Sequence, residues 1–408
     1  MIFKLFFKLS SMSSMAEHPS KPKKPLSLLF LLPTSFTFAC LLLALINGTL
    51  SFFSLPSPSV NELKPSSSPL MNISILISKQ RASINMNPKK MIINSKLKFL
   101  KPNKHSKLFS AKVSKFINSS CTLLFFMTWI SSSTYFGPRE LLSMESVFKF
   151  HPNACLLIVS NSMDTPKGAR ILKPYKDQGF KVLAISPDYY YFSTFLFRKT
   201  PAESWFKKLI QGSIDPGEVS LGQNMSNLIR LAILYKLGGI YLDTDVIVMK
   251  SLHGLKNVIG AQTLDVHGNW SRLNNAVMIF SKGHPLVLKF IEEFVKTFDG
   301  RKWGYNGPYL VSRVVERVAG KPGFEFSVLP PPAFYPVGWR RMEGLFERPL
   351  DGRHARWVKM KVERIKKESF ALHLWNRESR ELKVGEGSVI QRLIKVCCVL
   401  CDHFDGEF

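Results

Sequence analysis

Acidic residues are scarce in this sequence. The 408 residues include 29 Asp and Glu against 56 Lys and Arg, which gives a formal net charge of +27 at pH 7. The shortage is greatest in the first 115 residues, where 17 basic residues stand against two acidic ones. Such a charge can indicate nucleic-acid binding. Because no helix-turn-helix, zinc-finger or RNP-type aromatic pattern accompanies it, we predict no nucleic-acid partner and interpret the charge as suited to anionic substrates or a membrane surface.

Two motif classes are also missing. No G-x-G-x-x-G follows the first strand-like run, which argues against a dinucleotide-binding dehydrogenase. The sequence has six cysteines, and its C-C-x-x-C segment lacks the partner pairs of a zinc site. Cys40 lies in an apolar run, and the other five would face a lumen, where disulfides persist. Cys397, Cys398 and Cys401 are close enough for one bridge among themselves or to Cys121, and the connectivity stays open.

Charge is absent from Leu26–Ile46, a run of 21 residues, and a bilayer crossing needs ~20. Lysines lie on its N-terminal side, which predicts a cytosolic N-terminus. The alternative is a cleaved signal peptide, but the run is longer than a usual signal core and no small-x-small cleavage site follows. We predict a single-pass type II membrane anchor, a cytosolic tail over 1–25, a disordered basic stem over 47–120 and a lumenal domain over 121–408.

Strand-like and helical patterns alternate after Cys121. The apolar runs are Thr122–Ile130, Ala154–Ser160 and Lys181–Ile185, and the helical patterns are Pro138–Phe150 and Pro166–Gln178. We expect a fourth strand near Leu242. This alternation predicts an α/β domain with a Rossmann-like sheet, flanked by helices on both faces.

Two acidic residues interrupt the apolar stretch Gly238–Met249. Val, Ile and Tyr dominate it, so we expect a buried strand in which Asp243 and Asp245 point to the same side. Two buried carboxylates repel each other, and a divalent cation relieves that repulsion. Oxygen ligands favour Mg²⁺ or Mn²⁺, which keep open positions for phosphate oxygens. The stretch therefore predicts a metal site that holds a diphosphate, whereas the alternative is a polar turn between two strands.

A helical pattern precedes this acidic stretch. Apolar residues at positions 228, 231, 232 and 235 recur at helical spacing. Asn224 or Ser226 is the expected cap, and Gly238 is the expected end. Arg230 lies on this helix, where it would either hold a phosphate or sugar hydroxyl, or form a salt bridge that orients an aspartate. A capped helix that leads through glycines into D-x-D is far rarer than D-x-D alone.

Five recognisable segments follow one another along the chain. They are Ser226–Asp245, Leu273–Met278, Trp303–Leu310, Pro330–Pro336 and Ala371–Asn376. Over roughly residues 122–401 this series resembles the DXD-motif alpha-1,4-glycosyltransferases, in particular their plant-type branch. The resemblance implies a GT-A fold, Mn²⁺ or Mg²⁺, a UDP-sugar donor and a type II location in the Golgi membrane. It also implies transfer of a hexose, galactose or N-acetylglucosamine, to a glycan or glycolipid acceptor hydroxyl, in an alpha-1,4-type linkage with retention.

The resemblance also assigns roles to particular residues. Asp243, Asp245 and Arg230 would be catalytic. The metal ligands would be Asp243, Asp245 and His373, although a histidine on an apolar strand is more often a core residue. The expected UDP-sugar contacts are Asn227, Arg230, Tyr241, Asp243, Asn275, Asn306 and Gly307.

Two other functions stay open. Many relatives have Asp where this chain has Asn227, so a non-catalytic sugar-nucleotide-binding paralogue is one alternative. A haloacid-dehalogenase-type phosphatase is the other, since it also places D-x-D after an apolar strand. That fold needs its nucleophilic aspartate on an early strand, whereas about half of this chain precedes Asp243.

Overall fold

The computed structural model describes residues 109–117, 121–186 and 198–404. All of them belong to the unit Ile75–Phe408, one of two into which the chain divides. The predicted tail, the predicted anchor Leu26–Ile46 and most of the predicted stem lie outside the described residues. No helix within the described ranges combines the length and apolar character that a bilayer crossing requires.

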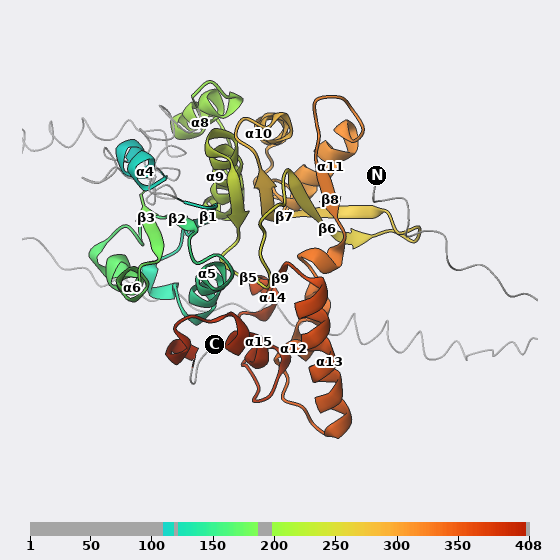
Figure 1. The fold of residues 1–408 in the computed structure, drawn as a ribbon. Coiled ribbons are helices and arrows are strands. Elements are labelled where there is room, and N and C mark those ends of the chain that lie inside the picture. Colours follow the sequence, from blue (N-terminus) through green and yellow to red (C-terminus); the bar gives the residue numbers. More distant parts are fainter. Residues whose placement is uncertain (1–108, 118–120, 187–197, 405–408) are drawn as a thin grey trace, which may run out of the picture. The chain divides into compact units, whose positions relative to one another are not determined.

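A seven-stranded sheet forms the centre of the domain, in the order β3-β2-β1-β4-β7-β6-β8 (Figure 1). Its first four strands along the chain are β1 (Leu124–Thr128), β2 (Cys155–Val159), β3 (Lys181–Ile185) and β4 (Gly239–Leu242). β1 is parallel to both β2 and β4, and β2 is parallel to β3. The predicted alternation of strands and helices is therefore confirmed in this half of the sheet.

The other half of the sheet makes it mixed. Its strands are β6 (Val258–Leu264), β7 (Trp270–Phe280) and β8 (Ser327–Leu329). β7 is antiparallel to both β4 and β6, while β8 is parallel to β6. Two short strands, β5 (Val246–Val248) and β9 (Ala371–His373), form a separate antiparallel sheet.

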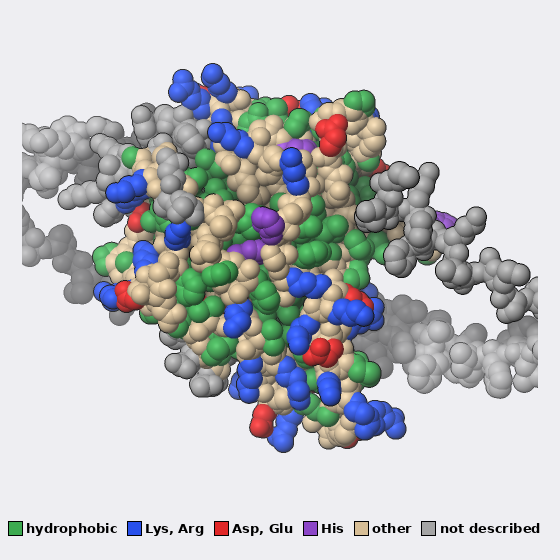
Figure 2. Space-filling model, viewed as in Figure 1, with side chains coloured by type: hydrophobic (Ala, Val, Ile, Leu, Met, Phe, Trp, Pro, Cys, Tyr) green, Lys and Arg blue, Asp and Glu red, His purple; other side chains and the backbone are tan. Residues whose placement is uncertain are grey.

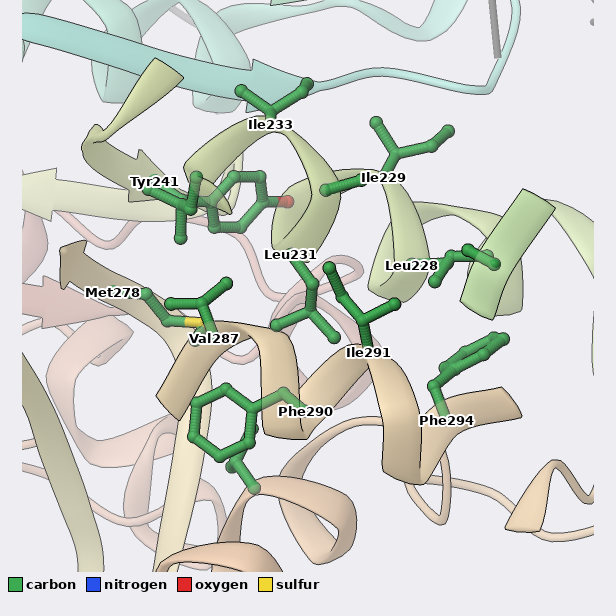
Figure 3. Close-up of a cluster of buried hydrophobic side chains, with 14 of the residues drawn as sticks. Leu228, Ile229, Leu231, Ile233, Tyr241, Met278, Val287, Phe290, Ile291 and Phe294 are labelled. Atoms are coloured by element: carbon green, nitrogen blue, oxygen red, sulfur yellow. The ribbon is translucent and has the colours of Figure 1, made fainter. Parts of the chain in front are cut away.

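Helices cover both faces of the large sheet. Their bounds are α4 (Phe109–Ile117), α5 (Pro138–Phe150), α6 (Pro166–Asp177), α8 (Pro201–Gln211), α9 (Leu221–Leu237), α10 (Pro285–Thr297), α11 (Pro308–Val318), α12 (Glu343–Phe346), α13 (Gly352–Glu368), α14 (Asn376–Ser379) and α15 (Val389–Cys397). Neighbouring strand residues face opposite sides, so Phe126 packs with α8 to α11 and Phe125 with α5 and α6. Figure 3 shows the first of these cores, where Leu231 of α9 lies beside Ile291 of α10.

The prediction that the acidic stretch Gly238–Met249 forms one continuous strand is wrong. β4 ends at Leu242, and Asp243, Thr244 and Asp245 form a turn before β5 begins in the other sheet. The Val246 N–H donates to the Asp243 carbonyl oxygen at 3.1 Å, which closes the turn. The backbone has the alternative form, a polar turn between two strands, and this turn still presents Asp243 and Asp245 as possible metal ligands.

Helix α9 begins earlier than expected. Its N-cap is Ser220, so neither Asn224 nor Ser226 caps it. Both lie inside the helix, and the Asn224 side chain accepts a hydrogen bond from Asn306 Nδ2 at 2.9 Å. Gly238 ends the helix as predicted, with φ of 68°. A Cβ there would lie 2.5 Å from the backbone nitrogen of Lys282, so only glycine fits this turn.

Two disulfides are present among the described residues, Cys121–Cys155 and Cys398–Cys401. The second is among the pairings that the sequence left open. The first was not foreseen, because its cysteines are 34 residues apart and become neighbours only when β2 pairs with β1. Cys397 is the free cysteine of the described residues. Burial raises the pKa of its thiol to about 12.

Buried His151 predicts a pH dependence of stability. Its Nε2 accepts the Leu252 N–H at 3.1 Å, which requires a neutral ring. Burial, followed by the charge of His253, lowers its pKa to about 4, against about 6.5 when unfolded. Between these values the unfolded chain binds more protons, so the free energy of unfolding should fall as pH falls from 6.5 to 4.

Thermal unfolding of His151→Gln across that pH range tests this expectation. Gln offers an oxygen to the Leu252 N–H but does not titrate, so the decline in melting temperature should be shallower than in the wild type. The control is His267→Gln, in an exposed turn, which should keep the wild-type decline. An unchanged decline in His151→Gln would contradict the assignment.

Candidate active site

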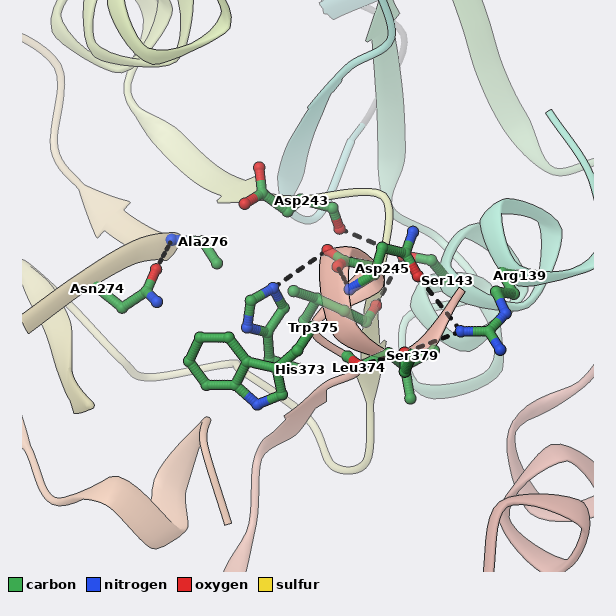
Figure 4. A network of polar contacts seen from close by, with 12 residues as sticks. Arg139, Ser143, Asp243, Asp245, Asn274, Ala276, His373, Leu374, Trp375 and Ser379 are labelled. Atoms are coloured by element: carbon green, nitrogen blue, oxygen red, sulfur yellow. Dashed lines mark hydrogen bonds and ion pairs between the residues drawn. The ribbon is translucent and has the colours of Figure 1, made fainter. Parts of the chain in front are cut away.

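Three potential metal ligands from two distant parts of the chain converge at the junction of the two sheets (Figure 4). Asp243 follows β4, Asp245 precedes β5, and His373 is the last residue of β9. One ligand atom from each side chain lies within 4.8 Å of the others. Antiparallel pairing sets Val246 opposite His373, so the register of the small sheet brings His373 beside Asp245.

Asp245 is held by contacts on both carboxylate oxygens. Its Oδ1 lies 3.2 Å from His373 Nε2, and its Oδ2 accepts the Asn376 N–H at 2.9 Å. Burial alone would raise the pKa of the Asp245 carboxyl, but the charge of His373 and these hydrogen bonds hold it below its usual value. Burial would likewise lower the pKa of His373, yet Asp245 raises it above the usual value.

Trp375 gives the chain a bend next to this pair. Its φ of 56° and ψ of 57° are left-handed, which is a strained conformation for a bulky side chain. The indole packs on His373 with ring centroids 4.2 Å apart, and its Nε1 donates to the Val337 carbonyl oxygen at 2.9 Å. These contacts fix the position of Trp375. The next residue, Asn376, donates its backbone N–H to Asp245. Strain of this kind concentrates at functional sites.

Asp243 is paired with a buried arginine. Its Oδ1 lies 3.0 Å from Arg230 Nη1, and Arg230 is only 2% exposed. The same oxygen accepts the Tyr241 hydroxyl at 2.8 Å. Arg230 also donates to the Asn275 carbonyl oxygen at 2.8 Å, and its guanidinium lies over the Tyr241 ring. Of the two roles expected for Arg230, this geometry matches the salt bridge that orients an aspartate.

Neutral amides form a second network behind these charges. Asn275 Nδ2 donates to Asn227 Oδ1 at 2.9 Å, and both residues are buried. Asn306 donates to the Asp299 carbonyl oxygen at 2.8 Å as well as to Asn224, so it ties the approach to α11 to α9. Gly307 packs against Asn227, where a Cβ would lie 2.9 Å from its Oδ1.

A cleft of about 1140 Å³ opens over this site. Six of the predicted site residues line it, namely Asn227, Arg230, Asp243, Asp245, Asn275 and His373. The other three predicted site residues do not line the cleft but contact residues that do; they are Tyr241, Asn306 and Gly307. The acidic pair and the histidine therefore face a space that is large enough for a nucleotide sugar.

Several cleft residues escaped the sequence analysis. Trp129 and Ser131 follow β1, and the rule that ligands bind at the carboxyl ends of parallel strands would have pointed to them. Arg272 and Tyr309 also line the cleft, with the guanidinium 4.4 Å from the ring centroid. Tyr309 lies in the recognisable segment Trp303–Leu310 but was given no role, and no sequence signal singles out Arg272, which meets Tyr309 only when β7 and α11 pack together.

The donor set suits a hard divalent cation. Two carboxylates and one imidazole match the ligands that Mn²⁺ accepts. The Nδ1 atom of His373 is buried and has no hydrogen-bond partner among the described residues. The ring nitrogen of His373 that faces Asp245 is Nε2, which is therefore the candidate metal donor. The residues present therefore fit a metal ion at Asp243, Asp245 and His373.

Comparisons with known proteins agree with this geometry. Residues 137–265, which contain D-x-D, match the family described as glycosyltransferase sugar-binding region containing DXD motif. Residues 279–404, which contain His373, match the family described as alpha 1,4-glycosyltransferase conserved region. The two matched regions together contain all three candidate metal ligands.

Curated relatives point the same way. Lactosylceramide 4-alpha-galactosyltransferase from Homo sapiens is 30% identical over 59% of this chain and 65% of its own length. The enzyme of that name from Pongo pygmaeus is 33% identical over 45% of this chain and 80% of the relative. Human alpha-1,4-N-acetylglucosaminyltransferase is 29% identical over 50% of this chain and 57% of its own length. The chain thus spans just under two thirds of the human galactosyltransferase, and it belongs to the DXD-containing alpha-1,4-glycosyltransferase family.

Proposed function

We propose that this protein is a metal-dependent glycosyltransferase that moves a hexose from a UDP-sugar to a hydroxyl of a glycan or glycolipid. The observation that carries the proposal is the convergence of Asp243, Asp245 and His373 on the wall of a large cleft. Relatives named for transfer of galactose and N-acetylglucosamine support either hexose as the donor sugar. The linkage would be alpha-1,4 in type and formed with retention, as the family resemblance implies.

The chain's own residues would prepare the site for a diphosphate. A bound Mn²⁺ or Mg²⁺ would supply the positive charge that offsets charge on the departing diphosphate. Arg230 fixes the direction of Asp243, and the Asn376 N–H fixes that of Asp245. Because both contacts exist before any ligand arrives, the carboxylates need little rearrangement. Arg230 is buried behind Asp243, so its proposed part in catalysis is to position that carboxylate.

The contacts to the UDP-sugar are also proposed. Asn227 and Asn275 line the cleft with neutral amides that suit hydroxyl or carbonyl groups of the donor. The other three residues would act indirectly, by positioning residues that line the cleft. Tyr241 would position Asp243, Asn306 would position Asn224, and Gly307 would position Asn227.

The proposal extends to fold family and location. A mixed sheet with a cluster of candidate metal ligands at the carboxyl end of β4 is compatible with a GT-A fold. The uncharged run Leu26–Ile46 supports a type II anchor in the Golgi membrane. Two disulfides support a lumenal domain, because disulfides persist in oxidising compartments.

A non-catalytic sugar-nucleotide-binding paralogue is a second candidate. Its support is the Asn227–Asn275 pair, which provides hydrogen bonds where many relatives have an acidic residue. The phosphatase alternative has no such support, because no aspartate directly follows the early strand β1.

Substitution of Asp245 tests the transferase. In full-length protein with Mn²⁺ and a panel of UDP-sugars, Asp245→Asn should reduce UDP release by about 10²-fold or more, since it weakens the metal site that would offset charge on the departing diphosphate. Asn keeps an oxygen for the Asn376 N–H, which protects the fold. The control is Asp177→Asn, at an exposed helix end. Normal release by Asp245→Asn would refute the metal role, whereas UDP binding without turnover by the wild type would select the binding paralogue.

Substitution of His373 tests the third ligand. We expect Mn²⁺ binding by His373→Gln, measured from the free-ion EPR signal, to be at least about 10-fold weaker than in the wild type. Because the pKa of His373 is raised, a proton competes with the ion even near neutral pH. Wild-type affinity should therefore rise with pH through this region, and the rise should be smaller in His373→Gln. The exposed His267→Gln serves as control; equal affinity in both variants would exclude His373 as a ligand.

A further inference from the structure

Helix α13 has an unusual excess of positive charge. Its 17 residues, GRHARWVKMKVERIKKE, hold seven Lys and Arg against two Glu. Val358, Val362 and Ile365 form its buried side. Residues on the opposite side are exposed, and in Figure 2 Lys and Arg side chains gather over the lower end of the molecule, where Figure 1 places α13.

Most of this charge is not neutralised. Arg364 pairs with Glu368 at 2.9 Å, and Lys366 pairs with Glu363 at 3.1 Å. Among the described residues no carboxylate pairs with the five other basic side chains of the helix, which are Arg353, Arg356, Lys359, Lys361 and Lys367. Burial lowers the pKa of Lys361, and the nearby charges of Arg364 and Arg341 lower it further. Positive charges are therefore crowded on this surface.

Large apolar side chains lie among these charges. Met360 is 64% exposed and Trp357 is 39% exposed, and Leu350 just before the helix is 87% exposed. At 100° per residue, Met360 lies nearly opposite the buried side chains and is flanked by Arg353, Arg356 and Lys367. The Leu350 N–H donates to His354 Nδ1 at 3.3 Å, which keeps Leu350 beside the first turn. We call Leu350, Arg353, Arg356, Trp357, Met360 and Lys367 the α13 outer surface.

We propose that the α13 outer surface lies on the face of a bilayer that carries anionic lipid headgroups. Basic residues around protruding apolar side chains match the chemistry of such an interface, where acidic headgroups attract Lys and Arg while Trp, Leu and Met enter the apolar boundary. A soluble polyanion would use the charges alone and leave three exposed apolar side chains in water. Charge and apolar exposure together favour the bilayer.

The surface continues to the cleft. Arg341, whose charge acts on Lys361, belongs to the short helix η6 (Trp339–Arg341). Trp339 is 41% exposed, carries Arg340 over its ring at 4.8 Å, and lines the cleft. Docking through α13 would bring this wall of the cleft near the headgroups. If the cleft transfers sugar as proposed above, a lipid-linked acceptor could enter directly from the bilayer.

A local probe separates this contact from any anchor elsewhere in the chain. Full-length protein carrying Met360→Cys, in a Cys40→Ser background, is labelled with an environment-sensitive fluorophore and reconstituted into vesicles. Cys397 is buried and the other four cysteines are in disulfides, so the label is directed to position 360. With phosphatidylserine present we expect a blue shift and quenching by nitroxide lipids. With phosphatidylcholine alone both effects should be smaller.

Two controls make the result specific. A label at Lys208→Cys, exposed on α8 at the opposite end of the molecule in Figure 1, should not be quenched. Charge reversal by Arg353→Glu, Arg356→Glu and Lys367→Glu should abolish quenching at position 360, whereas the two Arg→Lys changes should retain it. No quenching in anionic vesicles, or a response to heparin alone, would overturn the proposal. The readout does not depend on sugar transfer, so the proposed function can fail separately.

Discussion

The site depends on the positive charges that lie beside two neighbouring carboxylates, Asp243 and Asp245. Each has its own positive partner: Arg230 for Asp243, at 3.0 Å, and His373 for Asp245, at 3.2 Å. Without His373, desolvation would favour protonation of the Asp245 carboxyl and weaken it as a metal ligand. The long helix α9 carries Arg230, and the C-terminal strand β9 carries His373. Much of the fold therefore contributes to one electrostatic arrangement.

The two partners are not equivalent. Arg230 is always protonated and is surrounded by fixed acceptors, namely Asp243, the Asn275 carbonyl oxygen and the Ser226 hydroxyl. His373 can lose its proton, and its Nδ1 has no hydrogen-bond partner within the described part of the chain. One carboxylate thus has a permanent counter-charge, whereas the other has a counter-charge that an incoming cation can replace. A divalent ion at this site would therefore take the place of the His373 charge, not that of Arg230.

Local pattern predicted the first half of the domain well. Helix Pro138–Phe150 and strand Lys181–Ile185 have the predicted bounds, because proline, glycine and apolar periodicity mark their ends. The break at Asp243 was missed, since Tyr241 and Val246 are equally strand-like and only their partners, β7 and β9, differ. The same limit applies to Arg272 in the cleft, and to Cys155 as the partner of Cys121. Residues that meet only through tertiary packing leave no local signal.

The turn at Asp243–Asp245 has a mechanical consequence. At this turn the chain leaves the large sheet and enters the small one. Asp243 directly follows β4 of the large sheet, and Asp245 directly precedes β5 of the small sheet. An ion bound by Asp243, Asp245 and His373 would link the two sheets through its ligands. Loading and emptying the site would then stiffen and loosen the C-terminal third of the domain, including the helices packed on β9.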